Sequence, residues 1–399
     1  MSAGRKEPRI FTRTVVILGF ISLFTDMASE MLYPVLPLYL EQIGFGVVGI
    51  GILEGVAQGV AGLSKGWFGQ LSDRTGRRLP FVRWGYGLSA VAKPLMAIWA
   101  QPLWVLFART LDRLGKGVRT AARDALLSAE GTAAVKGRIF GFHRGMDTLG
   151  AAIGPALAVL WLWHAPEQYR PLFFIALLPG LLAVGLTLLL KEKTTETAQQ
   201  RPWPGFVAFL KYPYHSEASY RRLLIGLLAF ALINSSDFFL LLFMKEKGLS
   251  DSLLIGAYIL YNLVYAAVAL PAGWLADRLG MHRVFLMGLL CFSVVYGAMP
   301  LVTGWWAFAL LLALYGCFAA ATEGVSKAWI SNLVSKEEVA TAIGTYEALR
   351  SVAVLIASSV AGLIWAGFGA SALMIFTALA TLLVAAWIYF RVPPPRLAV

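Results

Sequence analysis

Residues 69–78 read Gly-Gln-Leu-Ser-Asp-Arg-Thr-Gly-Arg-Arg, a charged stretch between two long apolar runs. A segment of this kind cannot enter the hydrocarbon core of a membrane, and the flanking runs are too apolar to carry its charges. We therefore expect a tight loop at a membrane face. The residues on which this interpretation depends are Gly69, Asp73, Arg74, Gly76 and Arg77.

The same frame recurs in the second half of the chain. Residues 273–283 read Gly-Trp-Leu-Ala-Asp-Arg-Leu-Gly-Met-His-Arg, so Asp277 and Arg278 stand 204 positions after Asp73 and Arg74. A repeat of this length indicates two structural halves. Because it runs in the same direction in both, we expect parallel repeats about an axis along the membrane normal, with a cavity between them near the midplane.

The composition assigns the chain to the helical membrane proteins. Of its 399 residues, 58% are hydrophobic and 14% are charged, whereas a soluble domain carries about 25% charged residues. The apolar runs are about 20 residues long, as membrane-spanning helices require. The net charge of +12 does not indicate nucleic-acid binding, because the Lys and Arg side chains lie in short loops on one side of the spans. By the positive-inside rule, both termini are expected in the cytoplasm.

Twelve spans are expected, in two pseudo-symmetric bundles of six helices, so the predicted fold class is an all-α membrane protein. The expected spans are 14–40, 46–70, 80–100, 103–125, 138–163, 171–190, 222–244, 252–275, 284–302, 305–330, 340–366 and 370–390. Residues 1–190 and 222–399 would form the two bundles. Residues 191–221 are expected to form a cytoplasmic linker, with a surface-lying helix near Trp203–Tyr212.

Two further motifs accompany the charged stretch. Arg113-Leu-Gly-Lys-Gly117 lies in the fourth span, and Gly150-Ala-Ala-Ile-Gly154-Pro155 lies in the fifth. Together with twelve spans in two halves, they resemble the major facilitator superfamily over essentially the whole chain. The resemblance implies the major facilitator fold, a link between Arg113 and proton transfer, and the antiport branch of that family, which exports its substrates.

Ionisable side chains fall inside the spans of the first half, where a charge is tolerated only if it faces a cavity and is paired. Asp26 and Glu30 lie one turn apart in the first span, and Asp112 and Arg113 lie in the fourth. We expect the two acids of the first span to meet Arg113 across a cavity. Because neighbouring carboxylates repel when both are ionised, one of them would carry a proton, as proton coupling requires. A static ion-pair network is the alternative.

The second half carries few charges at equivalent depth. We therefore expect the first bundle to handle protons and the second to supply much of the substrate surface. Aromatic faces suit an organic substrate, although most single aromatic residues in such a protein face lipid or core. The residues assigned to the substrate cavity are Glu54, Gln58, Arg109, Asn234, Asp237, Tyr258 and Asn262.

Charged pairs at symmetric positions predict a cytoplasmic gate. Arg144 and Asp147 in the fifth span correspond to Glu347 and Arg350 in the eleventh, with opposite polarity. Pairing of Arg144 with Glu347, and of Asp147 with Arg350, would form a latch between the bundles. The alternative is that each pair is satisfied within its own helix.

The repeated frames are assigned to the same gate through Asp73, Arg74, Arg77, Asp277 and Arg278. A carboxylate at position 73 can accept hydrogen bonds from a helix N-terminus and stabilise its dipole. The family resemblance places that partner at the start of the eleventh span, near residues 340–345.

These features favour a secondary transporter: a proton-coupled exporter of a small organic molecule that works by alternating access in a bacterial-type cytoplasmic (inner) membrane. We expect a monomer in contact with lipid, protons and substrate, without a cofactor, a metal or nucleic acid. The alternative is an importer, or an exporter of a metal or metal-chelate complex, because Met27 and Met31 offer soft ligands near Glu30. An enzyme is not expected, since no nucleophile–base set and no Cys/His metal spacing occurs. The sequence does not identify the substrate.

Overall fold

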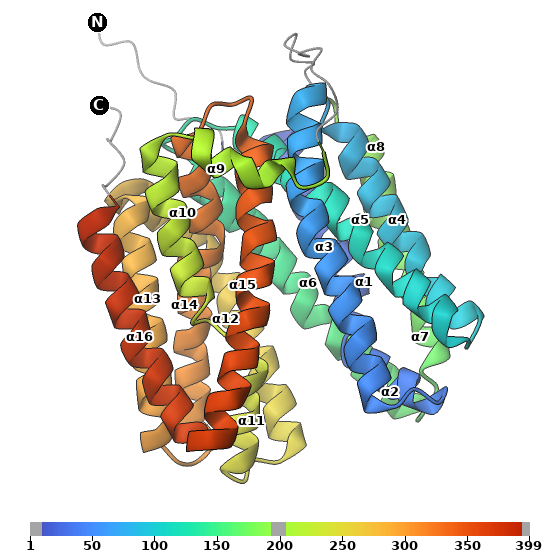
Figure 1. The fold of residues 1–399 in the computed structure, drawn as a ribbon. Coiled ribbons are helices and arrows are strands. Elements are labelled where there is room, and N and C mark those ends of the chain that lie inside the picture. The colour runs from blue at the N-terminus through green and yellow to red at the C-terminus, as the bar shows by residue number, and fades with distance from the viewer. Residues whose placement is uncertain (1–9, 193–204, 393–399) are drawn as a thin grey trace, which may run out of the picture.

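The computed structural model describes residues 10–192 and 205–392, and these residues are almost entirely helical (Figure 1). The helices of the first half are α1 (Arg13–Leu32), α2 (Val35–Gln42), α3 (Val47–Thr75), α4 (Leu79–Ile98), α5 (Pro102–Ala129), α6 (Lys136–His164), α7 (Arg170–Ile175) and α8 (Leu177–Leu188). Those of the second half are α10 (Ala218–Ala231), α11 (Phe238–Glu246), α12 (Asp251–Leu279), α13 (Met281–Ala298), α14 (Trp305–Leu333), α15 (Val339–Phe368) and α16 (Ala370–Arg391). Three short turns complete the order: η1 (Ala208–Lys211), α9 (Tyr212–His215) and η2 (Met299–Leu301).

The predicted spans correspond to these helices. Within the described ranges, eight helical segments are long and apolar enough to cross a membrane. The other four predicted spans coincide with α3, α4, α5 and the pair α10–α11. Three of the predicted spans each consist of two shorter helices. These pairs are α1 with α2, α7 with α8, and α10 with α11. The all-helical fold class is therefore confirmed.

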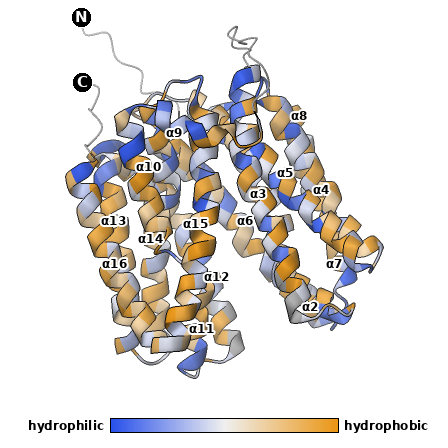
Figure 2. Ribbon diagram, viewed as in Figure 1, coloured by the Kyte–Doolittle hydropathy of each residue, from blue (hydrophilic) through white to orange (hydrophobic). Residues whose placement is uncertain are grey.

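The helices form two groups that meet at one end and diverge at the other (Figure 1). Helices α1–α8 make one group and α10–α16 the other. They meet at the basic end, which carries Arg78, Lys136 and Lys336. There the Arg78 side chain donates to the carbonyl of Lys336 at 2.7 Å, and Lys136 donates to that of Ser331 at 2.7 Å. Apolar residues run along the helices of both groups, and hydrophilic residues gather toward the basic end (Figure 2).

The described part of the linker crosses between the two groups at the basic end. Residues 203 and 204 of the expected surface helix lie outside the described residues, and the rest forms η1 and α9. Phe209 of η1 is fully buried and lies against Gly66 of α3. Its carbonyl accepts a hydrogen bond from Thr345 of α15 at 3.4 Å. The domain limits 1–190, 191–221 and 222–399 stay a prediction.

The charged stretch at 69–78 is mostly helical, which corrects the prediction of a loop. Helix α3 continues to Thr75, and Gly76 ends it with a φ of 63°. This left-handed backbone favours glycine, which explains the residue at the helix end. The connection to α4 is therefore only residues 76–78. Asp73 and Arg74 lie on the last turn of α3 and are held more rigidly than loop residues would be.

The closest packing between the groups is that of α3 on α15 and of α6 on α12, and α5 and α14 also take part. Glycines allow the paired backbones to touch. A Cβ added at Gly69 would overlap the carbonyl of Ala340, and one added at Gly273 would overlap that of Gly137. The first glycine of each repeated frame therefore lies where the two groups meet.

Gly273→Ala is expected to weaken the closed basic end. The new methyl group would overlap the Gly137 carbonyl, so α6 and α12 must separate, and overpacking of this kind costs about 1–3 kcal/mol. Thermal unfolding of the purified protein should therefore show a lower midpoint. Gly87→Ala is the control, because a Cβ at Gly87 meets nothing within 4 Å. Equal midpoints for the two variants would contradict this packing.

Candidate functional site

Asp73 ties the end of α3 to the start of α15. Its Oδ2 accepts a hydrogen bond from the backbone nitrogen of Thr341 at 2.6 Å and another from the Thr341 hydroxyl at 2.9 Å. Thr341 lies in the first turn of α15, where backbone N–H groups have no partner within the helix. The predicted contact between Asp73 and residues 340–345 is confirmed.

Asp277 makes the equivalent contact in the opposite direction. Its two carboxylate oxygens accept hydrogen bonds from the backbone nitrogens of Gly137 at 2.7 Å and Arg138 at 3.0 Å. The Arg138 side chain adds an ion pair at 3.0 Å. Gly137 and Thr341 are themselves 204 positions apart. Each repeated frame therefore caps a helix in the other group, and the two contacts are related by the internal repeat.

The arginines of the frames differ in what they contact. Arg78, which was not among the assigned gate residues, pairs with Asp73 at 3.4 Å. Arg77 is exposed, and its side chain makes no ion pair or hydrogen bond within the described chain. Arg278 stacks over the Trp274 ring at 4.0 Å. Arg78 thus reaches the contact between the groups, and the assignment of Arg77 to the gate stays a prediction.

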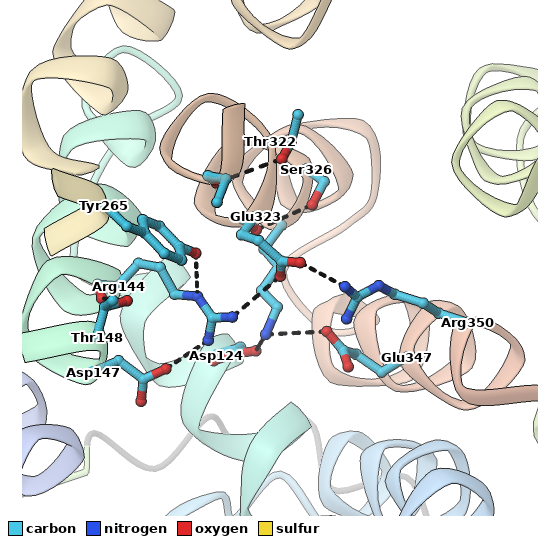
Figure 3. Close-up of polar contacts among 12 residues, drawn as sticks. Asp124, Arg144, Asp147, Thr148, Tyr265, Thr322, Glu323, Ser326, Glu347 and Arg350 are labelled. Atoms are coloured by element: carbon cyan, nitrogen blue, oxygen red, sulfur yellow. Dashed lines mark hydrogen bonds and ion pairs between the residues drawn. The ribbon is translucent and has the colours of Figure 1, made fainter. Parts of the chain in front are cut away.

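Arg144 of α6 bridges the two groups, but its partners differ from those predicted (Figure 3). It pairs with Asp147 of its own helix at 2.5 Å and with Glu323 of α14 at 3.2 Å, and it donates to the Tyr265 hydroxyl at 2.7 Å. Glu323 in turn pairs with Arg350 of α15 at 2.5 Å. The predicted pairs Arg144–Glu347 and Asp147–Arg350 are wrong, because Glu323 lies between the two arginines and binds both.

Glu347 belongs to a neighbouring set of ion pairs. It binds Lys65 of α3 at 3.0 Å and Lys327 of α14 at 3.2 Å. Lys327 also binds Asp124 of α5 at 2.9 Å. Lys65–Glu347 and Lys327–Asp124 therefore cross between the groups. Asp124 and Glu347 lie near Arg144 and Glu323 (Figure 3).

Asp26 lies near Asp147, the carboxylate that pairs with Arg144 on α6. It is half-buried on α1, and among the neighbouring carboxylates Asp147 acts on it most strongly. Asp147 also accepts a hydrogen bond from Ser22 of α1. Two carboxyl groups in contact repel unless a proton lies between them. The Asp26–Asp147 pair is therefore chemically suited to hold one proton.

The predicted contact of Asp26 and Glu30 with Arg113 is wrong in its main partner. The strongest attraction on either carboxylate comes from Lys116, one turn further along α5, and Arg113 acts on Glu30 more weakly. The guanidinium of Arg113 turns toward Asp112, with its Nε at 3.7 Å. Because residues 113 and 116 differ in helical phase, Lys116 faces α1 more directly.

Asp112 is the centre of a separate buried cluster between α4 and α5. It pairs with Lys93 at 3.2 Å and with Arg109 at 3.5 Å. Arg109 also pairs with Glu54 of α3 at 2.7 Å. These charges neutralise one another inside the first group, and a role of Asp112 in proton coupling stays a prediction.

A cavity of about 800 Å³ lies between the two groups, away from the basic end. Its lining comes from both groups and includes Tyr33, Asn234, Asp237, Tyr258, Tyr261 and Tyr315. Three of the seven assigned cavity residues are thus placed on its wall. The other four are not on it: Glu54 pairs with Arg109, the Asn262 amide donates to the Tyr258 carbonyl of its own helix, and Gln58 is exposed on α3.

The cavity lies beside the interruption of the seventh span. Residues 232–237 leave the helix between α10 and α11, and Asp237 accepts a hydrogen bond from the Tyr315 hydroxyl at 2.6 Å. Non-helical backbone at membrane depth is tolerated where it lines a cavity. The first span is interrupted at Tyr33 and Pro34, which also line the cavity. Residues 33 and 237 are related by the internal repeat.

The motif glycines of α6 serve packing against α1. A Cβ at Gly150 would overlap the carbonyl of Leu23, and one at Gly154 would lie against the Met27 carbonyl. Pro155 follows on the cavity wall. Among the described residues, no group of three or more His, Cys, Asp or Glu side chains that could hold a metal is found.

Lys65, Lys93, Lys116 and Lys327 are cations of this region that the sequence-based assignments did not include. Each is a single Lys within an otherwise apolar or glycine-rich stretch, and Lys116 lies inside the Arg113–Gly117 motif. A lone lysine at membrane depth is a usable signal, since it requires a carboxylate partner.

The whole chain matches one family. The sequence profile described as the Major Facilitator Superfamily matches residues 18–261 and 239–399. The chain belongs to the major facilitator superfamily. It is therefore a multi-pass membrane transporter, in agreement with the helices and the cavity between the two bundles.

Other members of the major facilitator superfamily resemble it over most of their length. The MFS-type transporter MJ1317 of Methanocaldococcus jannaschii is 29% identical over 371 residues, 92% of each chain. The multidrug resistance protein MdtG of Proteus mirabilis is 25% identical over 96% of each chain. Among solved structures, the human organic anion transporter MFSD10 has a TM-score of 0.81 at 19% identity, with 94% of this chain and 99% of that chain covered. The E. coli fucose:proton symporter FucP has a TM-score of 0.79 at 14% identity, with 96% and 99% covered.

Glu323→Gln is expected to loosen the closed basic end of this major facilitator protein. The amide keeps the shape of the side chain but loses the attraction that holds Arg144 and Arg350 from two different bundles. We expect the population open at the basic end to rise about tenfold, which corresponds to about 1.4 kcal/mol.

The distance between spin labels at Thr132 and Glu337, two exposed positions in different bundles, measures this opening. Cys291 and Cys317 are first replaced by Ser, so that only the labelled positions react. Glu246→Gln is the matched control, because Glu246 is exposed at the end of α11, away from the contact between the bundles. An unchanged distance distribution in Glu323→Gln would rule out the bridge as a closing contact.

Proposed function

We propose that this protein is a proton-coupled exporter of small organic molecules in a cytoplasmic membrane. The observation that carries the proposal is the contact between Asp26 and Asp147, because Asp147 also binds Arg144. A carboxyl group able to take up and release a proton thus lies beside Asp147, which binds Arg144, the residue that bridges the bundles. Coupling of ion and substrate movement requires such a connection.

The proposed mechanism follows from the charges of this pair. With one proton shared, Asp26 and Asp147 attract each other, and Asp147 keeps the geometry in which Arg144 reaches Glu323. When the proton leaves, two negative carboxylates face each other between α1 and α6. Their repulsion would displace α6 and strain the Arg144 bridge. Lys116 lies close enough to offset part of this charge.

The proposed orientation places the basic end in the cytoplasm, by the positive-inside rule. The structure then has its cytoplasmic side closed, and its cavity belongs to the outward-facing half of the cycle. Export is favoured over uptake by the name of one relative, a multidrug resistance protein, and by the Gly150–Pro155 motif. A carboxyl pair that takes up a proton from outside as the substrate leaves, and releases it to the cytoplasm as the bridge between Arg144 and Glu323 opens, would complete an exchange.

Asp26→Asn is expected to lower gradient-driven transport about tenfold, because an amide cannot release a proton; this corresponds to about 1.4 kcal/mol of activation free energy. The measurement is uptake of a compound panel into everted membrane vesicles, with and without a pH gradient. Glu41→Gln serves as the matched control, because Glu41 is exposed on α2 away from the pair. Glu30→Gln is tested separately and shows whether Glu30 contributes.

Two results would refute the proposal. One is equal transport by the wild type before and after the pH gradient is collapsed. The other is full gradient-driven transport by both Asp26→Asn and Glu30→Gln.

A further inference from the structure

The wall of the cavity between the bundles is largely aromatic. Tyr258 and Tyr261 of α12 have ring centroids 6.2 Å apart, and Tyr261 lies 5.2 Å from Tyr315 of α14. Phe318 continues the series at 5.2 Å from Tyr315. All four line the cavity, and Tyr33 contributes from the first bundle. The volume of about 800 Å³ lies within the range of pockets that hold drug-sized molecules, about 300–1,000 Å³.

Four charged side chains reach this wall: Asp237, Lys245, Glu323 and Arg350. Glu323 is neutralised by Arg350 at 2.5 Å and by Arg144 at 3.2 Å. Asp237 differs from it, because its hydrogen-bond partner is the uncharged Tyr315 hydroxyl, and no cation lies within ion-pairing distance of it in the described part of the chain. Lys245 lies two turns further along α11, about 12 Å away by the rise of the helix.

Carboxylates dominate the electrostatics around the tyrosines. Among the charged side chains, Glu30 and Asp237 act most strongly on Tyr258, and Asp237 and Glu323 act most strongly on Tyr261. The electron-rich faces of the rings add to this negative potential. Near Asp237, a cation that enters the cavity therefore meets both a carboxylate and aromatic faces, whereas Arg350 is already paired with Glu323.

The interruption of the seventh span offers acceptors. Asn234 lies in it, lines the cavity and has a buried Oδ1 without a hydrogen-bond partner. Asp237 ends the same segment. A buried acceptor without a donor costs free energy, which a ligand bearing N–H groups would recover.

We propose that this cavity binds an organic cation, with its positive group at Asp237 and its apolar part against the tyrosines. The proposal rests on the proposed function in that it names the substrate class of the same transporter. Cation–π contact and a carboxylate act together at such a site. The negative charge of the proposed site is the Asp237 carboxylate, in the non-helical segment between α10 and α11.

The test compares two ions of similar shape and opposite charge, tetraphenylphosphonium and tetraphenylborate. Binding of each radiolabelled ion to the purified full-length protein is measured by equilibrium dialysis, with protein-free detergent as the blank. We expect tetraphenylphosphonium to bind with an affinity at least about tenfold higher than that of tetraphenylborate, which corresponds to one effective charge contact.

Two substitutions locate the site. Asp237→Asn should weaken tetraphenylphosphonium binding about tenfold, whereas Glu246→Gln, at the exposed far end of the same helix, should leave it unchanged. Tyr258→Leu should weaken it about fivefold, and Tyr258→Phe, which keeps the aromatic face, should not. The Tyr258 pair keeps the test decisive if Asp237→Asn does not fold.

Equal binding of the two ions, or wild-type affinity in both Asp237→Asn and Tyr258→Leu, would overturn the cation site. Binding is measured without a gradient, so it does not depend on proton coupling. Selective cation binding together with transport that ignores the pH gradient would refute the proposed function alone. Gradient-driven transport of uncharged or anionic compounds with no cation binding would refute this inference alone.

Discussion

Two buried carboxylates hold the closed end of the protein together, and each binds the first turn of a helix in the opposite bundle. Asp73 accepts from Thr341 of α15, and Asp277 accepts from Gly137 and Arg138 of α6. A helix N-terminus offers free N–H donors and a positive dipole end, so charge-assisted bonds of this kind are strong. Because these contacts close one end, the space between the bundles remains at the other.

A continuous series of charged side chains connects the proposed proton site, the ion pairs between the bundles, and the cavity. It begins at Asp26 and Asp147, passes through Arg144 and Glu323, and ends at Arg350. Glu323 and Arg350 also line the cavity. The proposed proton site, the bridge between the bundles and the cavity are therefore in direct contact, without any need for a signal through apolar helices.

The structural features that the sequence predicted correctly depend on the length of the hydrophobic segments and on the internal repeat. The twelve spans followed from these patterns, whereas the contact of Asp73 with the start of α15 was implied by the family resemblance. The partners of Arg144 could not be predicted in this way, because helical phase alone does not rank Glu323 above Glu347 as the acid that binds it. Asn262 was assigned to the cavity, although its amide is satisfied by the carbonyl of Tyr258 one turn earlier. The prediction of a loop at 69–78 failed because charged residues can also extend a helix beyond the membrane.

The segment that joins the bundles bears on how far they can move. Phe209 lies buried against α3, and its carbonyl is bonded to Thr345 of α15. Further along, the hydroxyl of Tyr220 donates to the carbonyl of Ala342 at 2.9 Å. The segment thus crosses the contact between the bundles and is bound to both of them. A wide separation of the bundles at this end requires the Phe209 side chain to leave its buried position against α3. The segment therefore limits how far the bundles can separate and adds to the activation free energy of that movement.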